Sequence, residues 1–148
     1  MQAALAAAGS EATVIELPDS ARTAEEAAAA VGCPVGAIVK SLVFRGEASG
    51  GLWLILTSGA NRVHERRLGR LLGDPLARAD ADAVRAATGY AIGGVPPLAH
   101  ATTLPAVMDE ELLGYEAIWA AAGTPRCVFR ATPQEIAQMT GARIAPVV

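Results

Sequence analysis

The only lysine of this 148-residue chain, Lys40, lies inside the apolar run 37–44, and the other eleven basic residues are all arginine. An ammonium in a segment typical of a buried strand costs several kcal/mol unless a polar or anionic group meets it. One ordinary partner is water, which the ammonium reaches when the side chain snorkels to the surface. Another is an internal carboxylate. A ligand is the third, because a compact cation with three donors suits a phosphate or a developing negative charge. We therefore take Lys40 as a candidate catalytic residue, with snorkelling and an internal ion pair as the alternatives.

A second candidate is the segment 89–100, in which the glycine pair Gly93–Gly94 and the proline pair Pro96–Pro97 fall within five residues. This composition excludes an ordinary helix or strand and predicts a shaped loop. Adjacent glycines let backbone N–H groups converge on a carbonyl oxygen or an oxyanion, and the prolines would hold that shape. The alternative is a tight connection without a ligand. His100, at the end of the loop, is a further candidate.

Familiar catalytic motifs are absent, since the sequence has no Gly-x-Ser-x-Gly elbow, no phosphate loop ending in Gly-Lys-Ser and no His-Glu-x-x-His pattern. Its two cysteines, Cys33 and Cys127, have no close spacing, and its two histidines add no metal-binding pair. We therefore expect buried free thiols, no metal and no cofactor. His64 lies in an arginine-rich stretch and is expected to be a solvated surface residue.

These residues must be positioned by the elements around them, and the first half of the chain predicts two helices and three strands. A short helix over 1–8 precedes a strand over 13–17. Thr23 and Glu26 have the spacing of a capping box for a helix that ends at Gly32. The Lys40 strand and the apolar run 52–57 flank a Gly/Ser-rich turn. They are therefore expected to pair as a hairpin, with the second run as a central strand.

The second half predicts three more helices and three more strands. The helices are expected over 62–72 after Asn61, over 80–87, and from Pro133 to Met139. The strands are expected over 106–109, 116–121 and 126–130. Because strands outnumber helices and do not alternate strictly with them, the pattern favours an α+β fold, with helices packed around a mixed, largely antiparallel sheet. We expect one domain over 1–148.

The amino-acid composition and net charge of the chain limit the classes of protein and of binding partner that are expected. Hydrophobic residues make up 52% of the chain and charged residues 18%, which indicates a globular protein, and charged residues, Gly or Pro interrupt every apolar run before it could span a membrane. The start of the chain lacks the basic region of a secretory signal, so we expect a cytoplasmic protein. A net charge of −3 argues against broad nucleic-acid binding, and no DNA is expected as a partner. The one basic stretch offers either a local patch or a solvated helix face. It contains Arg62, Arg66, Arg67 and Arg70.

Three segments together resemble the YbaK/ProX family, whose members are freestanding relatives of the editing domain inserted in bacterial prolyl-tRNA synthetase. They are the strand 38–43 with Lys40, the loop 88–100 and the stretch 108–125. The similarity runs over 23–139, with the elements in the family's order.

The resemblance implies both a fold and a reaction. The fold would be a barrel-like mixed sheet forming a single editing domain. The reaction would be hydrolysis of the ester that joins a wrongly attached amino acid to the terminal ribose of a tRNA. Family members carry an essential lysine at the position of Lys40, and their Gly-x-x-x-Pro loop lines the pocket. That loop matches Gly93, Gly94, Val95, Pro96 and Pro97. Two departures bear on fine specificity: Ala99, where many relatives have glycine, and His64, where the stretch often carries aspartate.

Under this reading each candidate has a role. Lys40 would hold the 3′ CCA end of the aminoacyl-tRNA, and the Gly93 and Gly94 amides would hold the aminoacyl carbonyl. A bound water or the substrate's own ribose hydroxyl would supply the proton chemistry. The remaining candidates would orient that water or the α-amino group, or line the pocket. They are Ser41, Thr57, Val95, Pro96, Pro97 and His100. A synthetase could be a further partner.

The edited amino acid and the tRNA stay open at this point. Alanine, cysteine, 2-aminobutyrate and serine all fit the logic of editing, in which a second pocket removes what the first cannot reject. The tRNA could be that for proline or another. Two other functions are consistent with the residues: a binding module without catalysis that recognises an aminoacyl or nucleotide group, and an esterase acting on small aminoacyl esters.

Overall fold

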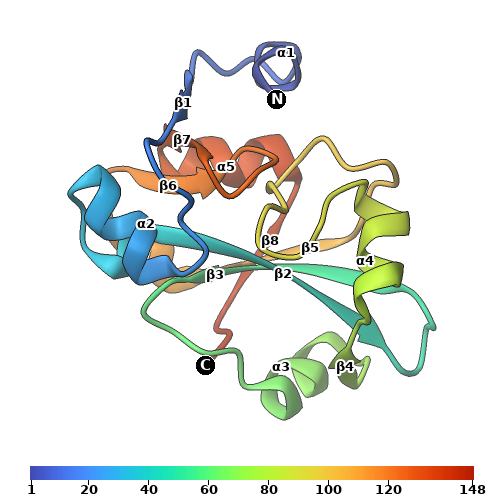
Figure 1. The fold of residues 1–148 in the computed structure, drawn as a ribbon. Coiled ribbons are helices and arrows are strands. Elements are labelled where there is room, and N and C mark those ends of the chain that lie inside the picture. The colour runs from blue at the N-terminus through green and yellow to red at the C-terminus, as the bar shows by residue number, and fades with distance from the viewer.

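The structure of the protein, a computed structural model, describes residues 1–148 and consists of a mixed sheet with helices packed around it (Figure 1). The helices are α1 (Gln2–Ala7), α2 (Ala24–Val31), α3 (Glu65–Leu72), α4 (Ala81–Thr88) and α5 (Pro133–Thr140), with 3-10 turns at η1 (Val35–Ala37) and η2 (Glu110–Gly114). The strands are β1 (Val14–Glu16), β2 (Ile38–Gly46), β3 (Leu52–Ser58), β4 (Leu76–Arg78), β5 (Ala106–Asp109), β6 (Ile118–Ala121), β7 (Cys127–Ala131) and β8 (Arg143–Ala145).

The strands follow the order β1-β7-β6-β2-β3-β5-β8, with β4 paired to β2 beside this path. The predicted hairpin is confirmed, because β2 and β3 are antiparallel neighbours. Four pairings are antiparallel and three are parallel, which confirms the α+β class with a mixed sheet. The path leaves β1 and β8 at its two ends, unpaired with each other. Strands β4 and β8 were not predicted, because each is short and has no flanking alternation in the sequence.

Both faces of the central strands are buried, which explains why residues 52–56 of β3 are all apolar instead of alternating. Leu54 and Leu56 belong to a core cluster that includes Ile136 of α5. Ile55 points to the opposite face and packs in a second cluster with Leu68 of α3. Because β3 lies between β2 and β5, its prediction as a central strand is confirmed.

Threonine side chains cap the starts of α2 and α5 in different ways. The Thr23 hydroxyl accepts a hydrogen bond from the Glu26 N–H at 3.1 Å, as expected. The Glu26 carboxylate, however, bonds to the Thr23 hydroxyl and not to its backbone N–H, so only half of the capping box forms. In α5 the box is complete between Thr132 and Glu135.

The helix predicted over 62–72 begins later than expected. Its first residue is Glu65, and its N-cap is His64, whose Nδ1 accepts a hydrogen bond from the Arg67 N–H at 3.1 Å. Histidine is not among the preferred N-cap residues, so the sequence pattern pointed to Asn61 instead. His64 is exposed, as predicted. The consequence is that residues 61–63 lie outside the helix, and the Asn61 side chain is available for another contact.

Both cysteines are free, but they are half-buried, whereas buried thiols were expected. None of the helices has the length and apolar character that crossing a membrane requires.

A buried carboxylate, Asp74, ties the hairpin turn to the end of α3. It accepts hydrogen bonds from the Ser49 hydroxyl at 2.6 Å, from Trp53 Nε1 at 2.8 Å and from the Ala48 and Ser49 N–H groups at 2.9 and 3.2 Å. Gly46 is required beside it, because a Cβ there would collide with the carboxylate. The Ser49 hydroxyl and the Trp53 indole lower the pKa of Asp74 from its ordinary value of 3.8 to about 2.

We predict that Asp74→Asn lowers the free energy of unfolding at neutral pH, because the amide cannot accept from all four donors. A depressed folded-state pKa means that the carboxylate contributes stability above its unfolded-state pKa and loses it as the pH falls through the folded-state value. The gap between wild type and variant should therefore shrink as the pH falls from about 4 to about 2. Urea unfolding at a series of pH values measures this gap. A gap that is constant across that range would show that Asp74 ionisation does not contribute.

Candidate active site

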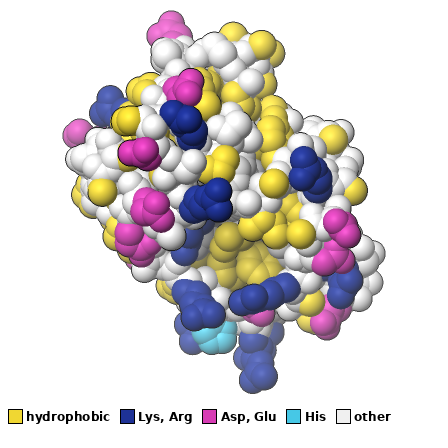
Figure 2. Space-filling model, viewed as in Figure 1, with side chains coloured by type: hydrophobic (Ala, Val, Ile, Leu, Met, Phe, Trp, Pro, Cys, Tyr) yellow, Lys and Arg dark blue, Asp and Glu magenta, His cyan; other side chains and the backbone are white.

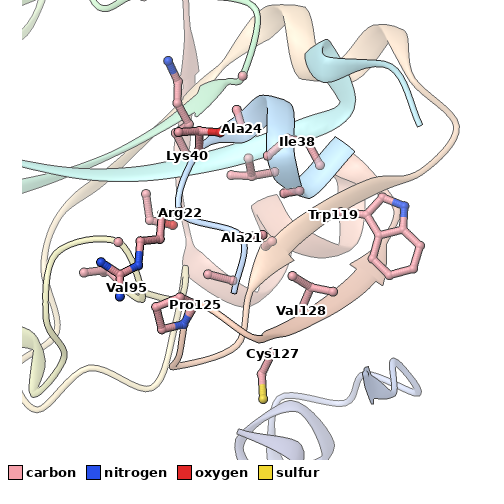
Figure 3. Close-up of a pocket in the computed structure, with 18 of the residues that line it drawn as sticks. Ala21, Arg22, Ala24, Ile38, Lys40, Val95, Trp119, Pro125, Cys127 and Val128 are labelled. Atoms are coloured by element: carbon pink, nitrogen blue, oxygen red, sulfur yellow. The ribbon is translucent and has the colours of Figure 1, made fainter. Parts of the chain in front are cut away.

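A cavity of about 410 Å³ lies between α2, one edge of β2, strands β6 and β7, and the 89–100 loop (Figure 3). We call it the lysine cavity. Its volume falls in the range of roughly 300–1,000 Å³ that is typical of small-molecule sites. The wall is mostly apolar and built largely of small side chains, with Trp119 the largest. Four of the residues proposed from the sequence line this cavity: Lys40, Ser41, Gly93 and Val95.

Lys40 lies at the border of the lysine cavity and is half-buried. Its Nζ donates a hydrogen bond to the Asn61 carbonyl oxygen at 2.6 Å, and Figure 3 shows the ammonium directed away from Trp119. The internal ion pair considered as an alternative does not form, since the only salt bridge in the structure joins Arg126 and Glu16. One donor of the ammonium is thus anchored, and two are left for a ligand.

A buried carboxylate holds the segment that anchors Lys40. Asp109, at the end of β5, is 0% exposed, and its Oδ2 accepts from Asn61 Nδ2 at 2.9 Å and from the Ser58 N–H at 3.1 Å. Its Oδ1 accepts from the Glu111 N–H at 3.0 Å. Both oxygens therefore have partners, as a buried carboxylate requires. Neither Asp109 nor Asn61 was predicted to belong to the site, because no spacing pattern connects residues 48 positions apart.

The Gly/Pro loop forms neither helix nor strand, as predicted, but its two glycines differ. Gly93 has a φ of +96°, and its N–H has no acceptor within the chain. The Gly94 N–H donates to the Ala91 carbonyl at 3.1 Å, which corrects the expectation that both amides are free for a substrate. Gly94 is needed for packing instead, because a Cβ would lie 3.1 Å from the Gly123 carbonyl oxygen and 3.3 Å from the Thr124 Cα.

The other residues proposed to bind substrate lie outside the lysine cavity. Pro96 and Pro97 are buried. The Nε2 of His100 donates to the Pro96 carbonyl oxygen at 2.6 Å, which puts the ring proton on this nitrogen and makes His100 a brace of the loop. Thr57 is fully buried opposite Lys40 in the hairpin, and its hydroxyl has no hydrogen-bond partner.

A second cavity, of about 320 Å³, lies beside the first, among β2, α3, β4 and α4. Its lining includes Arg62 and Arg78, so we call it the arginine cavity. In Figure 2 hydrophobic side chains form the floor of a hollow in the lower half of the molecule, and Lys or Arg side chains border it. Four residues line both cavities and join them: Ser41, Leu42, Ile92 and Val95.

Four arginines were candidates for a tRNA contact: Arg62, Arg66, Arg67 and Arg70. Of these, Arg62 lines the arginine cavity, and the other three line neither of the two cavities and are exposed on α3. Two cations that the sequence did not single out line the cavities instead. Arg22 borders the lysine cavity, where Figure 3 shows it reaching toward Val95, and Arg78 borders the arginine cavity. No local motif distinguishes these two arginines from ordinary surface residues.

The structure is that of an α+β protein with an apolar cavity, which Lys40 and Gly93, with its unpaired N–H, both line. The sequence matches the aminoacyl-tRNA editing domain over residues 18–139, and the chain belongs to this family. The resemblance noted in the sequence is thereby confirmed.

Two solved structures share this fold, and one curated sequence is similar to that of the chain. One solved structure, a candidate trans-editing enzyme for prolyl tRNA synthetase, is 55% identical with a TM-score of 0.93, and the match covers 99% of this chain and 92% of the other. The hypothetical protein APE2540 is 30% identical with a TM-score of 0.91, and the match covers 99% and 97%. The uncharacterized protein YwhH of Bacillus subtilis (strain 168) is 28% identical over 88% of this chain and 83% of its own length.

Proposed function

We propose that the protein is a trans-editing deacylase, which hydrolyses the ester between a wrongly attached small amino acid and the 3′ end of a tRNA. The observation that carries the proposal is that Lys40 and Gly93 line one apolar cavity, although 53 positions separate them in sequence. Membership of the editing-domain family supports the reaction class. The relative described as a candidate trans-editing enzyme for prolyl tRNA synthetase supports the tRNA for proline as the carrier.

The reaction needs few groups. Water adds to the ester carbonyl carbon, the bond from that carbon to the ribose oxygen breaks, and a free amino acid and a tRNA with a free terminal hydroxyl are released. The unpaired Gly93 N–H donates to the carbonyl oxygen as negative charge develops there. Lys40 holds the tRNA end with its two remaining donors. The proton of the attacking water passes through a second water or the neighbouring ribose hydroxyl.

The wall of the lysine cavity favours a small amino acid. Ala21, Ala24 and Ala27 of the α2 region belong to its apolar lining, together with larger side chains such as Val31 and Trp119. An apolar pocket separates side chains that differ by one methylene by only about 1–3 kcal/mol. A deacylase with a differently shaped pocket is therefore useful for alanine, 2-aminobutyrate, cysteine or serine attached to a tRNA that should carry another amino acid.

A panel of mischarged tRNAs tests the proposal. We expect the full-length protein to release at least one of these four amino acids from proline tRNA while sparing correctly charged prolyl-tRNA, with release of the labelled amino acid as the measurement. Small aminoacyl esters without tRNA serve as the control substrates. Turnover of these esters but of no tRNA would indicate the esterase instead. Binding of aminoacyl-tRNA without turnover of any panel member would indicate a binding module and overturn the proposal.

A further inference from the structure

One edge of β2 is open in the middle of the sheet. β3 covers the other edge along the whole strand, from Val39 to Arg45. On the open side β6 pairs only with Ile38 and Val39, and β4 pairs only with the last three residues, 44–46. Residues between these two pairings have no strand beside them. Both cavities border this gap, because Ser41 and Leu42 line each of them.

The hydrogen bonds at the two ends of the hairpin show which backbone groups face the gap. The Gly59 N–H donates to the Ile38 carbonyl at 2.7 Å, and the Gly46 N–H donates to the Gly51 carbonyl at 2.8 Å. In an antiparallel pair such bonds recur at every second residue. Even-numbered residues of β2 therefore bond to β3, and odd-numbered residues direct their N–H and C=O groups toward the gap.

Three backbone groups in the gap are left without a partner by this register. They are the N–H and C=O of Ser41 and the N–H of Val43. The Ser41 hydroxyl is also shielded from solvent and has no hydrogen-bond partner. Unpaired polar groups at a half-buried position are unfavourable unless water or a ligand meets them. The gap thus presents two backbone donors and one backbone acceptor in a row, which could bind a flat, polar ligand.

The arginine cavity adds charge and apolar surface next to this row. Arg62 and Arg78 supply two positive charges, and Glu65 supplies the one negative charge of the lining. Phe44 contributes an aromatic ring. Ile92, which is 65% exposed, lines both cavities, so a large apolar side chain stands in solvent at their junction. This combination suits a group with a flat ring and a phosphate.

We infer that the arginine cavity, with the open edge of β2, is the subsite for the terminal adenosine 5′-phosphate of the substrate. The inference rests on the proposed function, because adenosine is the nucleoside that carries the ester at a CCA end. The aminoacyl group then occupies the lysine cavity. The ester lies at the junction of the two cavities, beside Lys40 and Gly93.

The chemistry of adenine matches the exposed edge. Its 6-amino group donates to the Ser41 carbonyl, and its ring N1 accepts from the Val43 N–H, since a C=O and the N–H two residues later point the same way along a strand. The phosphate pairs with Arg62 and Arg78 through charge-assisted hydrogen bonds. The ring faces lie against the apolar lining, to which Phe44 belongs.

Titration of the full-length, ¹⁵N-labelled protein with 5′-AMP tests the subsite. We expect the Ser41 and Val43 amide signals to shift. Purine riboside 5′-monophosphate, which lacks only the 6-amino group, should bind about fivefold more weakly, as expected for one neutral hydrogen bond. Arg78→Ala should weaken AMP binding about tenfold and leave adenosine binding unchanged, since a charge-assisted bond is lost.

Two further variants sharpen the test. Glu65→Gln removes the negative charge of the lining and should strengthen AMP binding, whereas Arg143→Ala, an exposed arginine outside both cavities, should leave it unchanged. Unshifted Ser41 and Val43 amides, or equal AMP affinity in wild type and Arg78→Ala, overturn the subsite. If the protein deacylates tRNA but these amide signals do not shift, the proposed function stands and the subsite is rejected. If the amide signals shift but no tRNA is deacylated, the subsite stands and the proposed function is rejected.

Discussion

Lys40→Ala is expected to lower kcat/KM for tRNA deacylation by about 100-fold or more, as is typical when one preorganised charged donor is removed from an active site. The fold should persist. The side chain is half-buried and makes one hydrogen bond, to the Asn61 carbonyl, which is worth about 1 kcal/mol. Removing a charge from a strand also relieves part of its desolvation cost. Single-turnover deacylation and thermal unfolding of the same preparation measure both effects.

Two companion variants make this result specific. Lys40→Arg keeps the positive charge but replaces a compact ammonium with a planar fork, so it should recover only part of the activity. Arg45→Ala removes a charge from the same strand at an exposed position outside both cavities, and its activity should equal that of wild type. Wild-type turnover by Lys40→Ala would take the lysine out of the mechanism.

The elements around the site were predictable because local signals agree with the tertiary fold. The hairpin follows from two apolar runs on either side of a Gly/Ser-rich turn, and β3 lacks alternation because it packs on both faces. Pro133, at the first helical position, marks the start of α5. Such signals act within a few residues of one another, so a single sequence contains them.

The start of α3 and the hydrogen bonds within the site could not be predicted in this way. His64 takes the N-cap position that the pattern assigned to Asn61, because Asn61 is held by Asp109 from a strand far along the chain. The Gly93–Gly94 pair was recognised, yet only the turn that bonds Gly94 to Ala91 shows which amide stays free. Contacts of this kind depend on how distant segments meet, which neither spacing nor composition reports.

The open edge of β2 could not be predicted from the sequence either. The sequence predicted a strand at Lys40 and a central neighbour for it, but a strand pattern does not say which residues lack a partner on one side. That gap arises because the pairing of β2 with β6 stops at Val39, and its pairing with β4 begins only at Phe44. The polar groups proposed to read the substrate therefore belong to the backbone, and the identity of their side chains has little bearing on that role.

Asp109→Asn is expected to damage both stability and activity, although Asp109 lines neither cavity. The carboxylate accepts at both oxygens, so an amide NH₂ must face either the Glu111 N–H or the two donors on Ser58 and Asn61. In either orientation a buried donor meets a donor, which costs about 1–3 kcal/mol. The Asn61 carbonyl then loses its support, Lys40 is no longer anchored, and kcat should fall about tenfold or more. Urea unfolding and steady-state deacylation measure the two losses.

Asn61→Ala separates positioning from stability, because it cuts the link to Asp109 but leaves the Ser58 and Glu111 bonds in place. We expect a loss of stability of about 1 kcal/mol or less, together with a fall in kcat similar to that of Asp109→Asn. The single lysine provides an independent readout, because reductive ¹³C-methylation labels only Lys40 and the N-terminus. The Lys40 signal should shift in both variants and stay unchanged in Arg45→Ala. If Asn61→Ala keeps the wild-type signal and wild-type kcat, then Asp109 stabilises the fold without positioning the lysine, and the ammonium must be held in the active site by the substrate itself.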